Sequence, residues 1–129
     1  YTKKIQIEGR VLGDLTMNHI VPIASRYEAL LLDKVYKMSQ IPGLNASADI
    51  ALIKKIQDHT AEIQKLTGEM IDARKVANRI EDQREKAIAY HDTVAVFFDR
   101  IRYHIDKLEE IVDDQIWPLP KYRELLFLR

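Results

Sequence analysis

The chain of 129 residues contains no cysteine and has only four glycines, four prolines and one tryptophan. The absence of cysteine excludes disulfide bridges, thiol nucleophiles and the common zinc frameworks. No apolar run approaches the roughly 20 residues that a helix needs to cross a bilayer, so no membrane contact is predicted. Apolar and polar residues almost never alternate, which argues against a β-rich fold.

Charge of one sign is not in excess either, because 20 basic residues balance 20 acidic ones. A nucleic-acid-binding protein usually has a basic surface, so no nucleic-acid partner is expected. Hydrophobic residues make up 47% of the chain and charged residues 31%, which is typical of a folded domain. The chain begins at Tyr1 and runs directly into an amphipathic pattern, which we interpret as the start of a piece of a longer protein.

Apolar residues recur every three or four positions in three long segments, which predicts an all-α fold. Pro22 cannot donate to the carbonyl of Asn18, so the first helix should kink there. We expect a single domain over 1–129, an elongated antiparallel three-helix bundle of coiled-coil type with a short C-terminal tail or helix. The predicted elements are helices at about 2–39, 48–79 and 82–114 and a tail at 115–129.

The second and third segments contain coiled-coil seams, in which apolar residues alternate in steps of three and four. Asp82 and Glu85 resemble a capping box, which favours a turn before the third helix. A single unbroken helix through 78–82 is the alternative. The predicted seams are Ile56, Ile63, Leu66, Met70, Ala73, Ala77 and Ile80 in the second segment, and Ala87, His91, Val94, Phe98, Ile101, Ile105, Leu108 and Val112 in the third.

The four histidines are the first candidates for metal binding or acid-base chemistry, but no two of them are four residues apart. No Glu-x-x-His pair occurs, so the ligand pattern of a di-iron bundle is missing. We predict structural roles for His19 beside Pro22 and for His91 on the seam, and a place on the seam's shoulder for His104. Phosphate loops and known hydrolase motifs are also missing, so we predict no catalytic, cofactor-binding or metal-binding residue.

A dense acidic cluster ends the predicted third helix, where the helix dipole disfavours negative charge. The cluster could hold a metal or a basic partner, or Lys121, Arg123 or Arg102 could neutralise it once the tail folds back. The tail itself is too apolar to be left in water, so we expect it to dock on another surface. The acidic cluster is Glu109, Glu110, Asp113 and Asp114, and the expected docking residues are Trp117, Leu119, Tyr122, Arg123, Leu126 and Phe127.

Two stretches resemble a known family, the type III glutamine synthetases. Residues 5–27, with the run Asn18-His19-Ile20-Val21-Pro22 and then Arg26-Tyr27, are similar to the helix that follows the catalytic region of that family. Residues 100–127, with Trp117-Pro118-Leu119 and the closing run at 121–127, are similar to the family's C-terminus. The stretch between about 48 and 79 is generic coiled-coil sequence.

The resemblance implies a cytoplasmic, bacterial-type ligase of nitrogen metabolism that joins ammonia to glutamate with ATP and divalent metal (Mg²⁺). It also implies an upstream catalytic domain in the same chain and a homo-oligomer of stacked hexameric rings. No catalytic motif of the family has a matching position here, so we expect a non-catalytic domain for packing, subunit assembly or regulation. The alternatives are a free-standing interaction bundle of the spectrin-repeat or adaptor kind and, less supported, a small metal enzyme.

Overall fold

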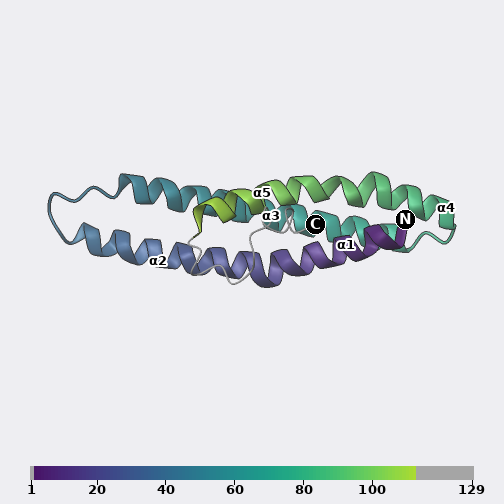
Figure 1. Cartoon of the computed structure of the whole chain (residues 1–129), viewed down its shortest axis with the longest axis horizontal. Coiled ribbons are helices and arrows are strands. Elements are labelled where there is room, and N and C mark those ends of the chain that lie inside the picture. The colour runs from purple at the N-terminus through teal and green to yellow at the C-terminus, as the bar shows by residue number, and fades with distance from the viewer. Residues whose placement is uncertain (1, 113–129) are drawn as a thin grey trace, which may run out of the picture.

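The computed structural model describes residues 2–112, which form three helical rods along one long axis, with no strand among them (Figure 1). Each rod runs antiparallel to the next in the chain, so the first and third point the same way. The predicted all-α helical bundle is confirmed. The first rod contains α1 (Thr2–Leu15), a π-helical segment (Thr16–Ile20) and α2 (Val21–Ser39). The second rod is α3 (Ser47–Asn78). The third rod contains α4 (Gln83–Ala89), a second π-helical segment (Tyr90–Val94), a 3₁₀ turn (Ala95–Phe97) and α5 (Phe98–Ile111).

Two short connections join the rods, and in each a side chain accepts a hydrogen bond at the start of the next helix. In the first, Gly43 has a φ of 91°, a left-handed conformation that favours glycine. The Asn45 side chain then accepts a hydrogen bond of 2.9 Å from the Ser47 N–H at the start of α3. In the second, Asp82 accepts a hydrogen bond of 2.9 Å from the Glu85 N–H and caps α4. The chain therefore turns between α3 and α4, and the unbroken helix is not observed.

The core lies along the axis between the three rods, and most of it comes from the predicted seams. Ala73, Ala87 and Ile80 are only partly buried. The remaining predicted seam residues are buried, apart from His91. The buried hydrophobic residues are Ile5, Leu12, Ile20, Ile23, Ala24, Leu31, Ile56, Ile63, Leu66, Met70, Ala77, Tyr90, Val94, Phe98, Ile101, Ile105, Leu108 and Val112.

The first π-helical segment stands where the sequence predicts a kink. Within it the Val21 N–H donates to the carbonyl of Thr16, five residues earlier, instead of four. The Thr16 hydroxyl donates to the Leu12 carbonyl at 2.7 Å. Pro22 offers no N–H and its ring would press on the preceding turn of a regular α-helix. The wider turn accommodates the proline, so the irregularity lies just before Pro22.

The second π-helical segment corrects the prediction for His91. Its side chain is 62% exposed, whereas the neighbouring Tyr90 is fully buried. The Ala95 N–H donates five residues back, to the Tyr90 carbonyl, so this turn takes up one extra residue. The extra residue changes the helical phase of everything before Val94, and Tyr90 takes the seam position that His91 would have in a regular α-helix.

Candidate functional site

A histidine pair joins the second and third rods where α3 and α5 pack together. The Nδ1 atoms of His59 and His104 are 2.9 Å apart, and the ring centroids are 5.1 Å apart. The Tyr103 ring stands edge-on to both imidazoles. At this distance one Nδ1 must carry a hydrogen and the other must accept it, so the pair holds a shared hydrogen bond.

Burial is the largest influence on the protonation of this pair. It lowers the pKa of His59, and Lys107 lowers it further. Burial also lowers the pKa of His104, and the nearby His59 has the next largest effect. Both imidazoles are therefore in their neutral form at pH 7, since each pKa lies below the usual 6.5.

A second polar cluster joins all three rods near the other end of the bundle. The Gln6 side-chain amide in α1 donates to the Tyr90 hydroxyl at 3.0 Å and to the Asn78 side-chain oxygen at 3.1 Å. The Tyr90 hydroxyl donates to the same Asn78 oxygen at the end of α3. We call these three residues the polar triad. It satisfies the one polar atom of a tyrosine whose side chain is otherwise enclosed in the core.

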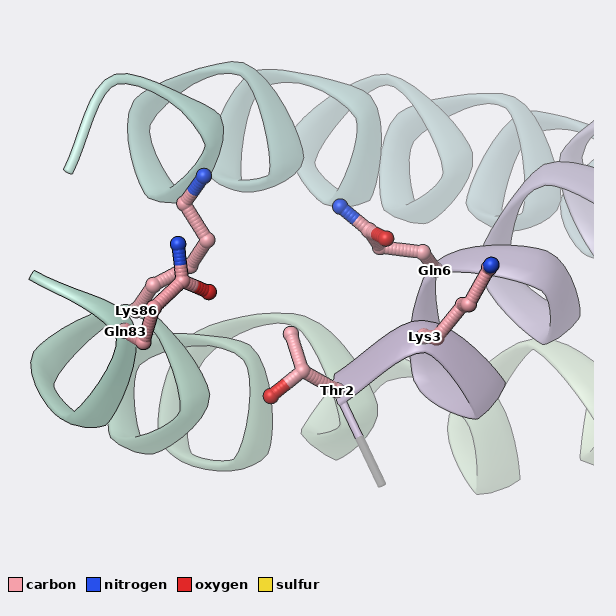
Figure 2. A pocket seen from close by; sticks show the side chains of 5 residues that line it. All are labelled: Thr2, Lys3, Gln6, Gln83 and Lys86. Atoms are coloured by element: carbon pink, nitrogen blue, oxygen red, sulfur yellow. The ribbon is translucent and has the colours of Figure 1, made fainter. Parts of the chain in front are cut away.

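Beside the polar triad lies an open pocket of about 470 Å³. Figure 2 shows Thr2, Lys3 and Gln6 reaching it from α1, and Gln83 and Lys86 from the start of α4. The lining carries two ammonium groups, two amides and a hydroxyl, and none of the five is a carboxylate or a histidine. Such a surface complements an anion but offers no acid-base pair for catalysis.

The predicted acidic cluster is only partly within the described residues. Glu109 is 3% exposed, and the exposed Glu110 has a carboxylate oxygen 3.9 Å from the ammonium of Lys107. Arg102, one of the predicted neutralising groups, forms an ion pair with Glu8 of α1 and lies 3.5 Å from Asp99. The cluster residues Asp113 and Asp114 lie outside the described part, as do the expected docking residues Trp117, Leu119, Tyr122, Arg123, Leu126 and Phe127.

Within residues 2–112 no three or more histidine, aspartate or glutamate side chains gather in a way that could hold a metal ion. None of the helices described has both the length and the apolar character to cross a membrane. His19 is exposed within the first π-helical segment.

Sequence reasoning missed the histidine pair because its members come from different rods. A signal was nevertheless present, since the predicted seam of the second segment steps seven residues from Ile56 to Ile63. His59 occupies the skipped position, and His104 directly precedes the seam residue Ile105. Packing the two seams antiparallel would have placed both histidines along one interface, although not at the same level along it.

Comparison with known proteins points to one family over the entire chain. The family model "Glutamine synthetase C-terminal domain" matches residues 1–39. A glutamine synthetase of Bacteroides fragilis is 52% identical over 134 aligned residues, which include all of this chain. A type-3 glutamine synthetase of Dictyostelium discoideum is 26% identical over 136 residues, and a glutamine synthetase of Butyrivibrio fibrisolvens is 25% identical over 128.

The chain spans 18% of the length of each of these three relatives. The family model covers the first rod, and the alignments with the Bacteroides and Dictyostelium enzymes extend over the other two rods and the tail. The resemblance that the sequence alone indicates is therefore supported at both ends of the chain. This chain is homologous to the C-terminal part of glutamine synthetases, with a type-3 enzyme among its relatives.

Proposed function

We propose that this chain is the non-catalytic C-terminal helical domain of a type III glutamine synthetase and that it provides assembly contacts. The observation that carries the proposal is the 52% identity to the Bacteroides enzyme across the whole chain. The alignment extends over all three rods, which favours conservation of a complete packing unit.

The activity of the parent enzyme is part of this proposal. It would join ammonia to glutamate with ATP, in the cytoplasm, at sites that lie in an upstream catalytic domain of the same chain. Those sites would hold Mg²⁺, a cation that prefers oxygen ligands. The parent would be a homo-oligomer of stacked hexameric rings, and the helical domain would contact its own catalytic domain or a neighbouring subunit.

The end of the hairpin between α2 and α3 is the surface best suited to such contacts. Five large apolar side chains there are each at least half exposed, and we call them the hairpin-tip patch. All five come from residues 32–50, and a concentration of exposed apolar side chains in one region is typical of a protein-protein contact. Because the chain is a small part of its relatives, we assign this patch to another part of the same enzyme assembly. The patch consists of Leu32, Tyr36, Ile41, Leu44 and Ile50.

The expected docking residues of the tail extend this proposal. Trp117, Leu119 and Tyr122, with Arg123, Leu126 and Phe127, are predicted from the sequence to contact either the bundle or the rest of the enzyme. The acidic cluster precedes them in the chain and would place opposite charge near Lys121 and Arg123.

The experiment uses the full-length enzyme carrying Tyr36→Glu together with Ile41→Glu. A carboxylate in an apolar contact must be desolvated, so the double variant should form smaller particles in sedimentation velocity and produce glutamine more slowly. The matched control is Gln57→Glu with Gln64→Glu, two exposed positions of α3 outside the patch. Circular dichroism of both variants checks that the helices are retained. Particles of unchanged size in the patch variant would contradict the proposal.

The elongated three-helix bundle also fits a free-standing interaction module of the spectrin-repeat or adaptor kind. The coding sequence upstream of Tyr1 separates the two candidates. An in-frame glutamine synthetase catalytic region supports the first, whereas a start codon directly before Tyr1 would favour the second.

A further inference from the structure

We propose that His59 and His104 form a bi-histidine clamp that binds one divalent transition-metal ion, such as Zn²⁺, between α3 and α5. The clamp is separate from the polar triad and from the hairpin-tip patch. It does not depend on the proposed assembly role of the domain, and its test can succeed or fail independently of that role.

The geometry of the pair is close to that of two ligands on one metal ion. Zn²⁺ binds histidine nitrogen at about 2.0–2.1 Å, so two such nitrogens lie about 2.9 Å apart at a right angle and about 3.3 Å apart at the tetrahedral angle. The two Nδ1 atoms are 2.9 Å apart. Both nitrogens lie at the interface between α3 and α5 with the separation that a shared ion requires. In the hydrogen-bonded pair they point at each other, so each ring must turn by about 35–45° to direct its Nδ1 lone pair at the ion.

Protonation also suits the exchange of a shared hydrogen for a metal ion. Metal binding requires both imidazoles to be neutral, with a lone pair on each Nδ1. One imidazole holds its hydrogen on Nδ1 in the hydrogen-bonded pair, and a shift of that hydrogen to Nε2 frees the second lone pair. No net proton is gained or lost in this step, and burial keeps both rings neutral by lowering their pKa values.

Charged groups from both helices surround the pair. His59 is influenced by Lys55 and Asp58 of α3 and by Lys107 and Glu110 of α5. His104 is influenced by Glu62 of α3 and by Arg100, near the start of α5. Three anionic and three cationic side chains thus face the pair, so the surroundings are neither strongly favourable nor strongly hostile to a cation.

Glu62 is the side chain best placed to add a third ligand. It lies one turn after His59 on the same face of α3, is partly buried, and acts electrostatically on His104. The described residues contain no ready-made cluster of three ligands, so the carboxylate would have to rotate towards the ion. Because the pair is only partly buried, water can complete the coordination.

The ligand chemistry selects the ion. Imidazole nitrogens suit Zn²⁺, Ni²⁺ and Cu²⁺, whereas Mg²⁺ prefers oxygen and octahedral geometry. The clamp therefore differs chemically from the Mg²⁺ sites proposed for the parent's catalytic domain.

The test uses the 129-residue chain and ZnCl₂ at neutral pH. We expect one Zn²⁺ per chain in isothermal titration calorimetry and a rise in the thermal midpoint that grows with the logarithm of Zn²⁺ concentration. Nitrogen NMR of the histidine rings should show the Nδ1 resonances of His59 and His104 shifting, with those of His19 and His91 unchanged. MgCl₂ at the same concentration should produce neither effect.

Three variants localise the ion. His59→Gln or His104→Gln should each remove the Zn²⁺-dependent rise in midpoint, and Glu62→Gln should reduce it. His91→Gln is the matched control, because this exposed histidine lies on the same rod outside the pair, and it should retain the full rise. Absence of Zn²⁺ binding by the unmodified chain would overturn the proposal. Binding of Zn²⁺ by His59→Gln and His104→Gln as tightly as by the unmodified chain would also overturn it. The NMR measurement on the unmodified chain decides the matter if a variant fails to fold.

Discussion

At the scale of single residues, substitution by alanine should have opposite effects on stability at two glycines outside the core. Gly68 lies on an exposed part of α3, and an added methyl group there would have no atom within 4 Å. Gly43 also has open space around it, but its φ of 91° is strained for a residue with a side chain. Helix propensity therefore decides the effect of alanine at Gly68, and backbone conformation decides it at Gly43.

Gly68→Ala should raise the free energy of unfolding by about 1 kcal/mol, because alanine favours the interior of a helix by that amount. Gly43→Ala should lower it by about 1–2 kcal/mol, since a left-handed conformation is costly for L-residues. Urea denaturation followed by circular dichroism measures both. A destabilised Gly68→Ala variant would mean that this face of α3 is covered by something in solution.

Single residues also show where prediction from the sequence reaches its limit. The seam pattern correctly places Val94, Phe98 and Ile101 in the core, because a regular repeat fixes which face is buried. His59 and His104 are 45 residues apart in the chain, so no spacing rule pairs them. Their proximity depends on how far α3 and α5 slide along each other, which the hydrophobic repeat alone leaves undetermined.

At the scale of elements, the π-helical segments are what the sequence pattern fails to predict. A π-helical turn changes the count between two buried positions by one residue, and in the third rod this change replaces His91 by Tyr90 in the core. No glycine or proline marks that place in the third rod. In the first rod Pro22 gives a local signal, so the irregularity could be predicted there, although not its π-helical form.

Deleting Asp92 tests this interpretation of the third rod. The deletion should turn the π-helical segment into a regular helix while both Tyr90 and Val94 remain on the core face, so we expect a loss of at most about 1–2 kcal/mol. Deleting Asp99 instead should rotate one half of the rod by about 100° relative to the other and abolish cooperative unfolding. Thermal denaturation followed by circular dichroism distinguishes the two. Equal destabilisation by both deletions would show that the extra residue at the π-helical segment is needed for stability.

At the scale of the whole molecule, the histidine pair makes the stability of the bundle depend on pH. The pKa values of His59 and His104 are lowered in the folded state, so the unfolded chain binds more protons below the unfolded value of about 6.5. The free energy of unfolding should therefore fall as the pH falls from about 6.5 towards the folded pKa values, and level off above about 6.5.

Urea denaturation at about pH 5.5 and at about pH 7.5 measures this dependence. The double variant His59→Gln, His104→Gln should lose less stability between the two conditions than the unmodified chain. These measurements are made without transition metals, so that they report protons alone. An identical loss in the double variant would assign the pH dependence to other groups.

The overall architecture could be predicted well from the sequence, because three amphipathic segments and two turn signals leave few arrangements. Asp82 and Glu85 in the sequence favour a turn before α4, and in the structure the same pair forms the cap. The proposed assembly role of the domain could not be derived this way. It would depend on surfaces such as the hairpin-tip patch, and no local sequence pattern identifies the partner of such a surface.

The polar triad influences which alignment of the rods along one another the chain adopts. Seams that repeat every seven residues stay largely apolar when one rod slides along another by one repeat, so hydrophobic burial alone distinguishes such alignments poorly. Gln6, Asn78 and Tyr90 meet in one alignment, and any slide would leave the buried tyrosine hydroxyl without its partners. The hydrogen bonds of the triad thus favour one of these alignments over the others as the native one.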